Sequence, residues 1–450
     1  MKSKNQPVWF KGTNVNDAVE QFTVGCDREM DIYLARFDVI GTVAHIRMLE
    51  SIGLLSAEEL TMLEKELKTI YRCILDNDFC IEDDVEDVHS QIELLLTRRL
   101  GDTGKKIHSG RSRNDQVLVD IKLFIRNEIE EIVKNIVILF DTLISQSEKY
   151  SDVLMPGYTH LQVATPSSFG LWFGAYAESL TDDLRLMNVA WQVVNQNPLG
   201  SAAGYGSSFP LNRTMTTQLL GFDDLNYNVV YAQMGRGKTE KTVAFAMASI
   251  AATLARFAFD ACLYMSQNFG FITVPDQLTT GSSIMPHKKN PDVFEVIRAK
   301  CNKIQALPND ITLITNNLPS GYFRDMQILK EMIFPAFNEM KKCLEMMTFM
   351  TSQIAINRNI LDDDRYRYIF SVEKVNELTL SGVPFRDAYK EVGSAINEGR
   401  FNPVKKVEHS HEGSIGNLCN DKIRAKMEAV LNGFSFEKVN KALTELFSPQ

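Results

Sequence analysis

The strongest constraint on the fold of this chain is a long helical repeat of apolar residues. Between residues 125 and 143 they recur at steps of three and four, with Glu and Lys between them: Ile125, Ile129, Ile132, Ile136, Phe140 and Leu143. This spacing places them on one face of an α-helix, which turns once every 3.6 residues. The repeat predicts a continuous amphipathic helix of about five turns.

A second repeat, over residues 242–265, has the same spacing and is apolar on its other faces too. Phe245, Ala248, Ala252 and Phe259 stand outside the main stripe, so we expect this helix to be buried nearly all round. Charged Arg256 and Asp260, one turn apart, argue against a membrane span. Helices of this kind need partner helices, which a multi-subunit bundle would supply.

Further helices are expected over 292–306, ending before Pro308, and over 323–356, with Pro335 as a kink or break. Segments rich in Gly, Ser, Pro and Asn, among them 156–166 and 279–291, are expected to be loops.

The whole pattern predicts an all-α chain in three segments. We expect an N-terminal helical domain at 1–108, a central helical bundle at 109–357 and a small C-terminal helical domain at 358–450.

Charge and cysteine content narrow the possible partners and the compartment. The 450 residues carry a net charge of −9, which disfavours a nucleic-acid or anionic-membrane partner because phosphate surfaces need excess Lys and Arg. The seven cysteines form no CxxC pair, so neither a disulfide framework nor a zinc ribbon is expected. Residues 1–11 contain no apolar core of a secretory signal. We therefore expect a cytoplasmic protein.

The segment GSSIMPHKKNP, from Gly281 to Pro291, has the strongest chemical character. A Gly-Ser-Ser turn exposes two hydroxyls, and Lys288 and Asn290 follow as donors. Pro291 begins a predicted helix, whose free N–H groups favour a carboxylate. On composition alone, a flexible solvated loop before a helix explains the segment equally well.

This string resembles the GSSxMPxKxN signature of the fumarase/aspartase superfamily. The resemblance implies that a base removes a proton next to a carboxylate, that an aci-carboxylate forms, and that the bond one carbon away breaks to give fumarate. It makes Ser282 the base, while Lys288 and Asn290 hold the substrate carboxylate and its developing charge. A serine hydroxyl is a poor base, so positive charge and backbone N–H groups must stabilise the alkoxide.

The segment PGYTHLQ, residues 156–162, contains a Pro-Gly turn that we expect to present a Thr-His pair. A lone histidine is usually a packed or surface residue, but histidine titrates near neutrality and suits proton transfer. The segment resembles the GYTHLQ element of the same superfamily. The resemblance implies a proton-transfer role for His160, with Thr159 and Gln162 as substrate ligands.

The run HSGRSRNDQ, residues 108–116, precedes the first long helix. Two Arg, two Ser and an Asn at a helix start can bind a carboxylate through forked hydrogen bonds; a capped, charged helix start is the plainer explanation. The run resembles the H-[ST]-GRSRND motif that marks argininosuccinate lyases within the superfamily. It implies that Ser112, Arg113 and Asn114 bind substrate.

Shorter matches follow the same family order. Glu86–His89 resembles an EDVH element, which would bring Asp87 and His89 to the site; without the resemblance it would be an acidic surface patch. Tyr322, Gln327 and Lys330 resemble a Y….Q..K element of substrate ligands and would otherwise pass for a solvated polar face. Gln327 and Lys330, three apart, are expected to share a helix face.

The resemblance implies argininosuccinate as substrate, cleaved to arginine and fumarate in arginine biosynthesis. It also implies no cofactor and no metal, and a homotetramer in which each site draws on three subunits. A lyase acting on adenylosuccinate or another N-succinyl compound, or a catalytically silent relative, remains an alternative. Two stretches depart from the family pattern. Val24–Asp31 lacks the usual Ser-containing segment before the first helix, and Met234–Lys238 keeps only the Arg of the family's Ser-Asp-Arg-Asp string.

Overall fold

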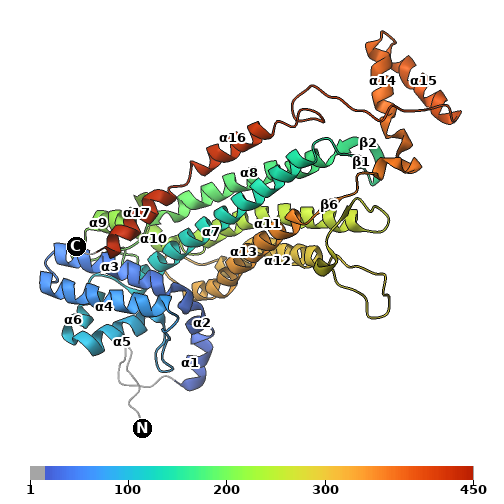
Figure 1. The fold of residues 1–450 in the computed structure, drawn as a ribbon. Helices are drawn as coiled ribbons and strands as arrows, with labels where there is room; N and C mark the ends of the chain where they lie inside the picture. The colour runs from blue at the N-terminus through green and yellow to red at the C-terminus, as the bar shows by residue number, and fades with distance from the viewer. Residues whose placement is uncertain (1–15, 449–450) are drawn as a thin grey trace.

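The computed structural model describes residues 16–448, so the expectation of no secretory signal over residues 1–11 lies outside the described residues. Long helices run side by side along an extended molecule (Figure 1). The bundle is built from α7 (Arg113–Lys149), α8 (Phe169–Val194), α11 (Lys238–Met265), α12 (Asp292–Thr315) and α13 (Leu329–Ser352). The prediction of an all-α fold is confirmed, because the strands are few and short.

The helix predicted over 125–143 is confirmed as part of α7, which is longer than expected. Every residue of the predicted apolar stripe is buried. Upstream, charged Asp120 and Lys122 break the apolar pattern, although both are buried. The apolar spacing therefore could not reveal the first turns of the helix. A capping box begins the helix: the Ser112 hydroxyl accepts from Asn114 N, and Ser112 N donates to Asp115 Oδ1.

Within the single chain α11 is not covered on every face, so its expected burial nearly all round, with partner helices, stays a prediction. It packs against α8 and α12, but Phe245 and Phe259 are 58% and 51% exposed within the single chain. Among the described helices, α11 is the one long and apolar enough to cross a membrane. Its remaining faces belong to the core of the bundle, and its exposed phenylalanines form an outward apolar face.

The two internal prolines do not break their helices. α12 runs through Pro308 to Thr315, so the predicted end before Pro308 is wrong, and α13 runs through Pro335. A proline inside a helix removes one backbone hydrogen bond. The buried stripe continues across Pro308, from Leu307 to Ile311, and this packing keeps the segment helical.

Shorter helices gather at one end of the bundle (Figure 1). α3 is buried along most of its length and packs on both α7 and α4, which fixes the N-terminal helices to the start of the bundle. These helices are α1 (Asp17–Val24), α2 (Asp27–Asp31), α3 (Ala35–Ser51), α4 (Ala57–Leu75), α5 (Val88–Leu100) and α6 (Asp102–Lys105), followed later in the chain by α9 (Arg213–Leu219) and α10 (Val229–Met234).

Residues 156–166 were expected to be a loop and instead form most of an antiparallel hairpin. β1 (Leu154–Thr159) pairs with β2 (Gln162–Ser168), and the turn is His160–Leu161 rather than Pro-Gly. Both turn residues have positive φ, 53° and 56°, as a two-residue type I′ turn requires. Gly157 lies in a bulge, where an added Cβ would come 2.7 Å from Thr165 O.

Two further strand pairs are only two residues long. β3 (Gln196–Asn197) pairs in parallel with β4 (Asp224–Leu225), and β5 (Ile272–Thr273) pairs antiparallel with β6 (Ala355–Ile356). They tie loops to the bundle and do not form a sheet layer.

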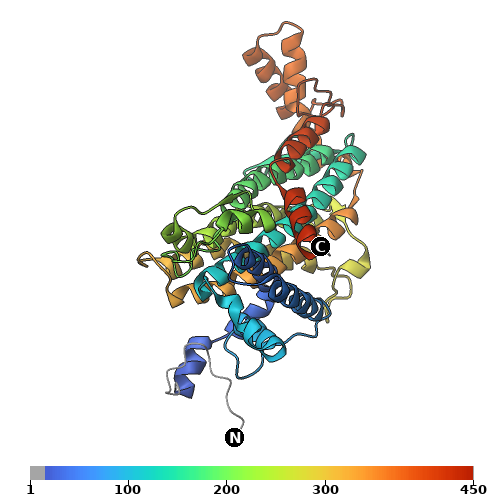
Figure 2. The same cartoon turned by 90° about the vertical axis from the view of Figure 1, so that its left-hand side faces the viewer.

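The C-terminal part of the chain has two different surroundings. α14 (Ser371–Leu380) and α15 (Phe385–Asn397) share a small core of their own and stand away from the bundle in both views (Figures 1 and 2). α16 (Asn420–Leu431) packs on α8. α17 (Phe436–Phe447) returns to α3 and α9. The proposed division at residues 108 and 357 stays a prediction.

Candidate active site

A cavity of about 450 Å³ lies where the N-terminal helices meet the starts of α7 and α13. Its walls bring together eight of the predicted substrate-binding residues from three separate segments. These are Asp87, His89, Ser112, Arg113, Asn114, Tyr322, Gln327 and Lys330.

The first turn of α7 presents Ser112, Arg113 and Asn114 to the cavity. The capping box uses the Ser112 hydroxyl, so the plainer explanation of this run, a capped helix start, is also correct. Arg113 donates to Ser90 Oγ at 2.8 Å and to Gln116 Oε1 at 3.1 Å. These bonds hold the guanidinium in place at a helix N-terminus, where an anion is favoured.

α5 contributes Asp87 and His89 to the same cavity. Asp87 caps the helix by accepting from Ser90 N at 2.6 Å. Burial opposes ionisation of Asp87, but Arg113 and His89 outweigh it and hold its pKa below the usual range. The ring of His89 contacts Asp38 through Nδ1 and lies 3.3 Å from Asp120 Oδ2, while its Nε2 has no protein partner.

Behind His89 lies a buried polar network on α3, which also holds the 109–112 loop: Arg111 donates to Thr42 Oγ1 at 3.1 Å, and His45 Nε2 contacts Ser109 O at 2.9 Å. Asp38 accepts from His89, from Thr42 Oγ1 at 2.9 Å and from Gln116 Nε2. Burial opposes ionisation of Asp38, but His89 and Arg111 keep its pKa well below the usual range. Burial and neighbouring Asp38 raise the pKa of Asp120 well above it.

Asp38, His89 and Asp120 place three possible metal-ligand atoms within 4.8 Å of one another. The ring Nδ1 of His89 hydrogen-bonds to Asp38 and lies 3.3 Å from Asp120 Oδ2, and Gln116 and Thr42 donate to Asp38 as well. This donor set is that of a hydrogen-bonded network, and it leaves little of the Asp38 carboxylate for a cation.

α2 and the start of α13 form the opposite wall. Lys330 Nζ lies 2.6 Å from Asp31 Oδ1 and also pairs with Asp27. Gln327 donates from Nε2 to Thr23 O and Val24 O, at 3.0 Å each. Gln327 and Lys330 were expected to share a helix face; both line the cavity, but Gln327 ends a short 3-10 turn and Lys330 belongs to α13.

Sequence reasoning missed several residues of this cavity. Asp27 and Asp31 line it, although the Val24–Asp31 segment was noted only for its departure from the family pattern. Arg236 lines it too, held by Glu240 at 2.9 Å; it is the one family residue kept in Met234–Lys238, and that was the available signal. The other missed lining residues are Glu86, Ser90, His108, Val117 and Arg324.

The remaining predicted residues, on the signature loop and the hairpin, do not line this cavity. On the loop before α12, the Ser282 hydroxyl accepts from Ile284 N at 3.4 Å and from Met285 N at 3.2 Å. Asn290 pairs with Thr280, which closes the base of the loop. Lys288 is exposed and has no ion-pair partner among residues 16–448.

Two backbone N–H groups thus point at the hydroxyl that the resemblance makes the base. An alkoxide at Ser282 would gain from both.

The hairpin tip places Thr159, His160 and Gln162 at the surface. β1, β2 and the segment between α11 and α12 lie toward one end of the bundle, while α2 and α5 lie at the other (Figure 1). The predicted site residues therefore form two groups within one chain: those of the cavity, and those on the loop and hairpin.

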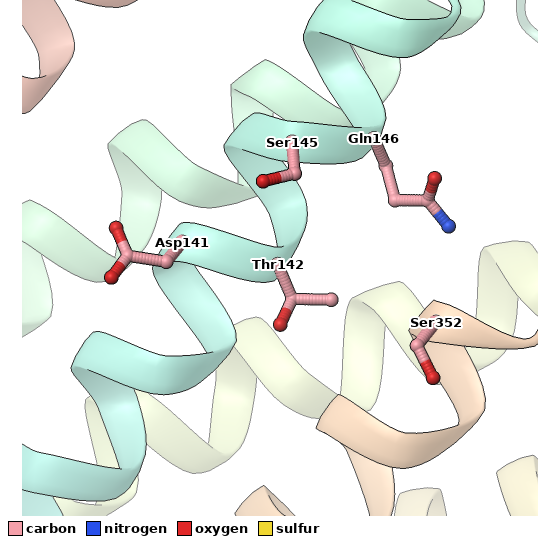
Figure 3. A pocket seen from close by; sticks show the side chains of 5 residues that line it. All are labelled: Asp141, Thr142, Ser145, Gln146 and Ser352. Atoms are coloured by element: carbon pink, nitrogen blue, oxygen red, sulfur yellow. The ribbon is translucent and has the colours of Figure 1, made fainter.

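A second hollow, of about 340 Å³, lies between α7 and α13 (Figure 3). Its lining residues are Asp141, Thr142, Ser145, Gln146 and Ser352. Gln146 donates to Thr351 O at 2.8 Å, so its amide links the two helices. The lining has no cationic side chain to hold a carboxylate, and none of the predicted site residues.

The chain is similar in sequence and fold to known lyases. A family model described as lyase matches residues 13–306. The chain is 67% identical to the argininosuccinate lyase of Parabacteroides distasonis over 98% of this chain and 99% of that protein. It is 66% identical to that of Bacteroides thetaiotaomicron, over 97% and 99%. The fold matches a class II fumarase from Schistosoma mansoni with a TM-score of 0.71 at 16% identity, over 95% and 94% of the two chains.

Proposed function

The chain belongs to the argininosuccinate lyase family of the fumarase/aspartase superfamily, and on that premise we propose how its residues perform the reaction. It is a carbon–nitrogen lyase that cleaves argininosuccinate to arginine and fumarate by β-elimination. The observation that supports this assignment best is the 67% identity over nearly the full length of both proteins. The arginine product places the reaction in arginine biosynthesis.

Ser282 is the base of the reaction. It removes the proton from the succinyl carbon next to a carboxylate, and the electron pair moves into that carboxylate to form the aci-carboxylate. The two N–H groups that donate to Ser282 Oγ stabilise its alkoxide. The ammonium of Lys288 and the amide of Asn290 hold the substrate carboxylate while negative charge develops on it.

The collapse of this intermediate breaks the C–N bond and releases the guanidino nitrogen of arginine. A proton must reach the reacting groups, and His160, whose imidazole is exposed at the hairpin tip, transfers or relays it. Thr159 and Gln162 flank it as substrate ligands. In the cavity, Ser112, Arg113 and Asn114 bind a substrate carboxylate at the N-terminus of α7. The other substrate ligands in the cavity are Asp87, His89, Tyr322, Gln327 and Lys330.

The complete site forms between copies of the chain in a homotetramer. Two features support this proposal. The hairpin and the signature loop lie away from the cavity that holds the other ligands (Figure 1). α11 carries an exposed apolar face at Phe245 and Phe259, and burial of such a face against other copies is favourable. We further propose that the enzyme is cytoplasmic.

The test is release of fumarate, followed by its absorbance, from argininosuccinate, adenylosuccinate, malate and aspartate. We expect argininosuccinate to be cleaved far faster than the other three. A faster rate on adenylosuccinate or another of them would refute the substrate while leaving the superfamily chemistry in place. No turnover of any of the four by a folded tetramer would favour the catalytically silent alternative.

A further inference from the structure

Asp27 is the cavity residue that the resemblance explains least. It lies in the Val24–Asp31 segment that departs from the family pattern, at the start of α2. Its side chain lines the cavity and is only 14% exposed. A largely buried carboxylate must be paired with a cation of the protein, or must pair with a cationic group of the ligand.

The charged residues of the cavity wall are unevenly paired. Arg324 pairs with Glu86 at 3.1 Å, and Arg236 pairs with Glu240 at 2.9 Å. Lys330 is shared: it pairs with Asp31 at 2.6 Å and also with Asp27. Two carboxylates with one ammonium leave this corner with an excess negative charge.

Of the two carboxylates, Asp31 is the one already satisfied. It is 1% exposed, and its second oxygen accepts from Val88 N at 3.2 Å. Within residues 16–448, Asp27 has Lys330 as its one ion-pair partner. The excess negative charge is therefore available to a ligand through Asp27.

We propose that Asp27 binds the α-ammonium of the arginine half of the substrate and is a specificity residue of this enzyme. The inference rests on the proposed function. The guanidinium is bonded to the carbon where cleavage occurs, so it must lie beside Ser282 and His160, which are not part of this wall. The wall of α2 then faces the other end of the substrate, whose positive charge is the α-ammonium. A ligand cation there would balance the second carboxylate, since Lys330 is shared between Asp27 and Asp31.

The ionisation of Asp27 agrees with an unfilled cation position. Burial raises the pKa of Asp27 to about 6, with Lys330 opposing the shift and Asp31 and Asp87 adding to it. An ammonium bound at this point would favour the ionised carboxylate. Arginine binding should therefore weaken as the pH falls through about 6, because Asp27 takes up a proton.

Calorimetric titration of the assembled enzyme with two ligands tests the assignment. Arginine carries the α-ammonium, and 5-guanidinopentanoate lacks it while keeping the guanidinium and the carboxylate. The wild-type enzyme should bind arginine about 10- to 100-fold more tightly, the range of one charge-assisted hydrogen bond. Asp27→Asn should reduce the affinity for arginine to that for the analogue, while the affinity for the analogue stays within about twofold of the wild-type value. It should also remove the pH dependence of arginine binding near pH 6.

Glu29→Gln is the matched control. Glu29 lies on the same short helix, carries the same charge and is exposed outside the cavity lining, so it should keep the wild-type preference. Asp27→Ser, checked for tetramer formation by light scattering, replaces Asp27→Asn if the amide disturbs Lys330.

Two results would overturn the inference. Equal losses for both ligands would mean that Asp27 acts by positioning Lys330, and unchanged arginine affinity would mean that it does not touch the substrate. Turnover of argininosuccinate by the wild-type enzyme is measured alongside. Its absence would refute the proposed function, whereas an unaltered ligand preference in a turning-over enzyme would refute only the role of Asp27.

Discussion

Two adjacent serines on the signature loop differ in a way that bears on which one is the base. Ser282 is half-buried and receives two backbone N–H groups, while Ser283 is exposed. Ser282→Ala should reduce kcat by about 10²- to 10⁴-fold, the usual contribution of positioned proton transfer. Folding should be preserved, because the side chain makes no core contact. The measurement is steady-state fumarate release by tetramer of verified size.

Ser283→Ala is the internal control and should have the smaller effect. If it is the more damaging substitution, the base is the second serine. If both variants keep near-full activity, neither serine is the base, and His160 becomes the leading candidate.

A buried histidine should make the stability of the protein sensitive to acid. Burial and neighbouring Arg111 lower the pKa of His45 to about 3, while its unfolded value is about 6.5. Between these values the unfolded chain holds a proton that the folded chain does not. The free energy of unfolding should therefore fall as the pH is lowered from about 6.5, by about 1.4 kcal/mol per pH unit for this group.

His45→Gln keeps a donor for Ser109 O, which His45 Nε2 contacts at 2.9 Å, and removes the titration. Urea unfolding of both proteins between about pH 5 and pH 7 should give a shallower pH slope for the variant. Equal slopes would show that the pKa of His45 is the same in the folded and the unfolded protein.

At the residue scale, sequence was a good guide wherever a motif lay beside the start of a helix. Ser112 to Asn114, Asp87 and Lys330 meet in one cavity as expected. Asp31 could not be predicted, since it lies in a stretch without a matching local signature, whereas Arg236 had a signal as the one family residue kept in its stretch. The partner of Lys330 is distant in sequence, and only the packing of α2 against α13 brings it close.

At the scale of elements, α11 gives the clearest prediction. Its exposed Phe245 and Phe259 would be buried by other copies. Because about half of each residue is already covered, each would contribute about 1–1.5 kcal/mol. The double variant Phe245→Asp and Phe259→Asp should lower the oligomeric state while leaving the helix content unchanged, because both side chains lie outside the core of the chain. Light scattering and circular dichroism measure the two quantities.

Phe245→Leu with Phe259→Leu keeps the face apolar and should remain assembled. A tetramer with undiminished stability after both Asp substitutions would place the interface elsewhere.

Helix periodicity predicted the helices of the bundle, but local rules about proline and glycine misplaced a helix end and a turn. Pro308 was expected to end a helix, but the buried Ile304, Leu307 and Ile311 continue the packing across it. Pro156-Gly157 was expected to be a turn, but the strands pair through it, and the turn falls at His160 and Leu161. In both cases contacts with distant segments outweigh the preference of a single residue.

At the scale of the whole molecule, two inactive variants should restore each other. If each site takes Ser282 and His160 from different chains, a mixture of Ser282→Ala and His160→Asn chains contains sites with both native residues. Random assembly of equal amounts would give about one native site in four. Dissociation, mixing and reassembly should therefore recover about a quarter of the wild-type activity per site.

Each variant reassembled alone is the control and should stay inactive. No recovery in tetramers proven to contain both chains would mean that Ser282 and His160 act from the same chain.

α7 has a further consequence for how the protein can change. Its 37 residues extend for about 55 Å, with Ser112 to Asn114 at one end and, just beyond the other, the hairpin that carries His160 (Figure 1). A rigid helix transmits any change of length to both ends, and one inserted residue would turn one end by about 100° relative to the other. Surface loops tolerate added residues far better. If each site takes the first turn of α7 and the hairpin from different chains, one residue inserted within α7 would misalign groups in two sites at once.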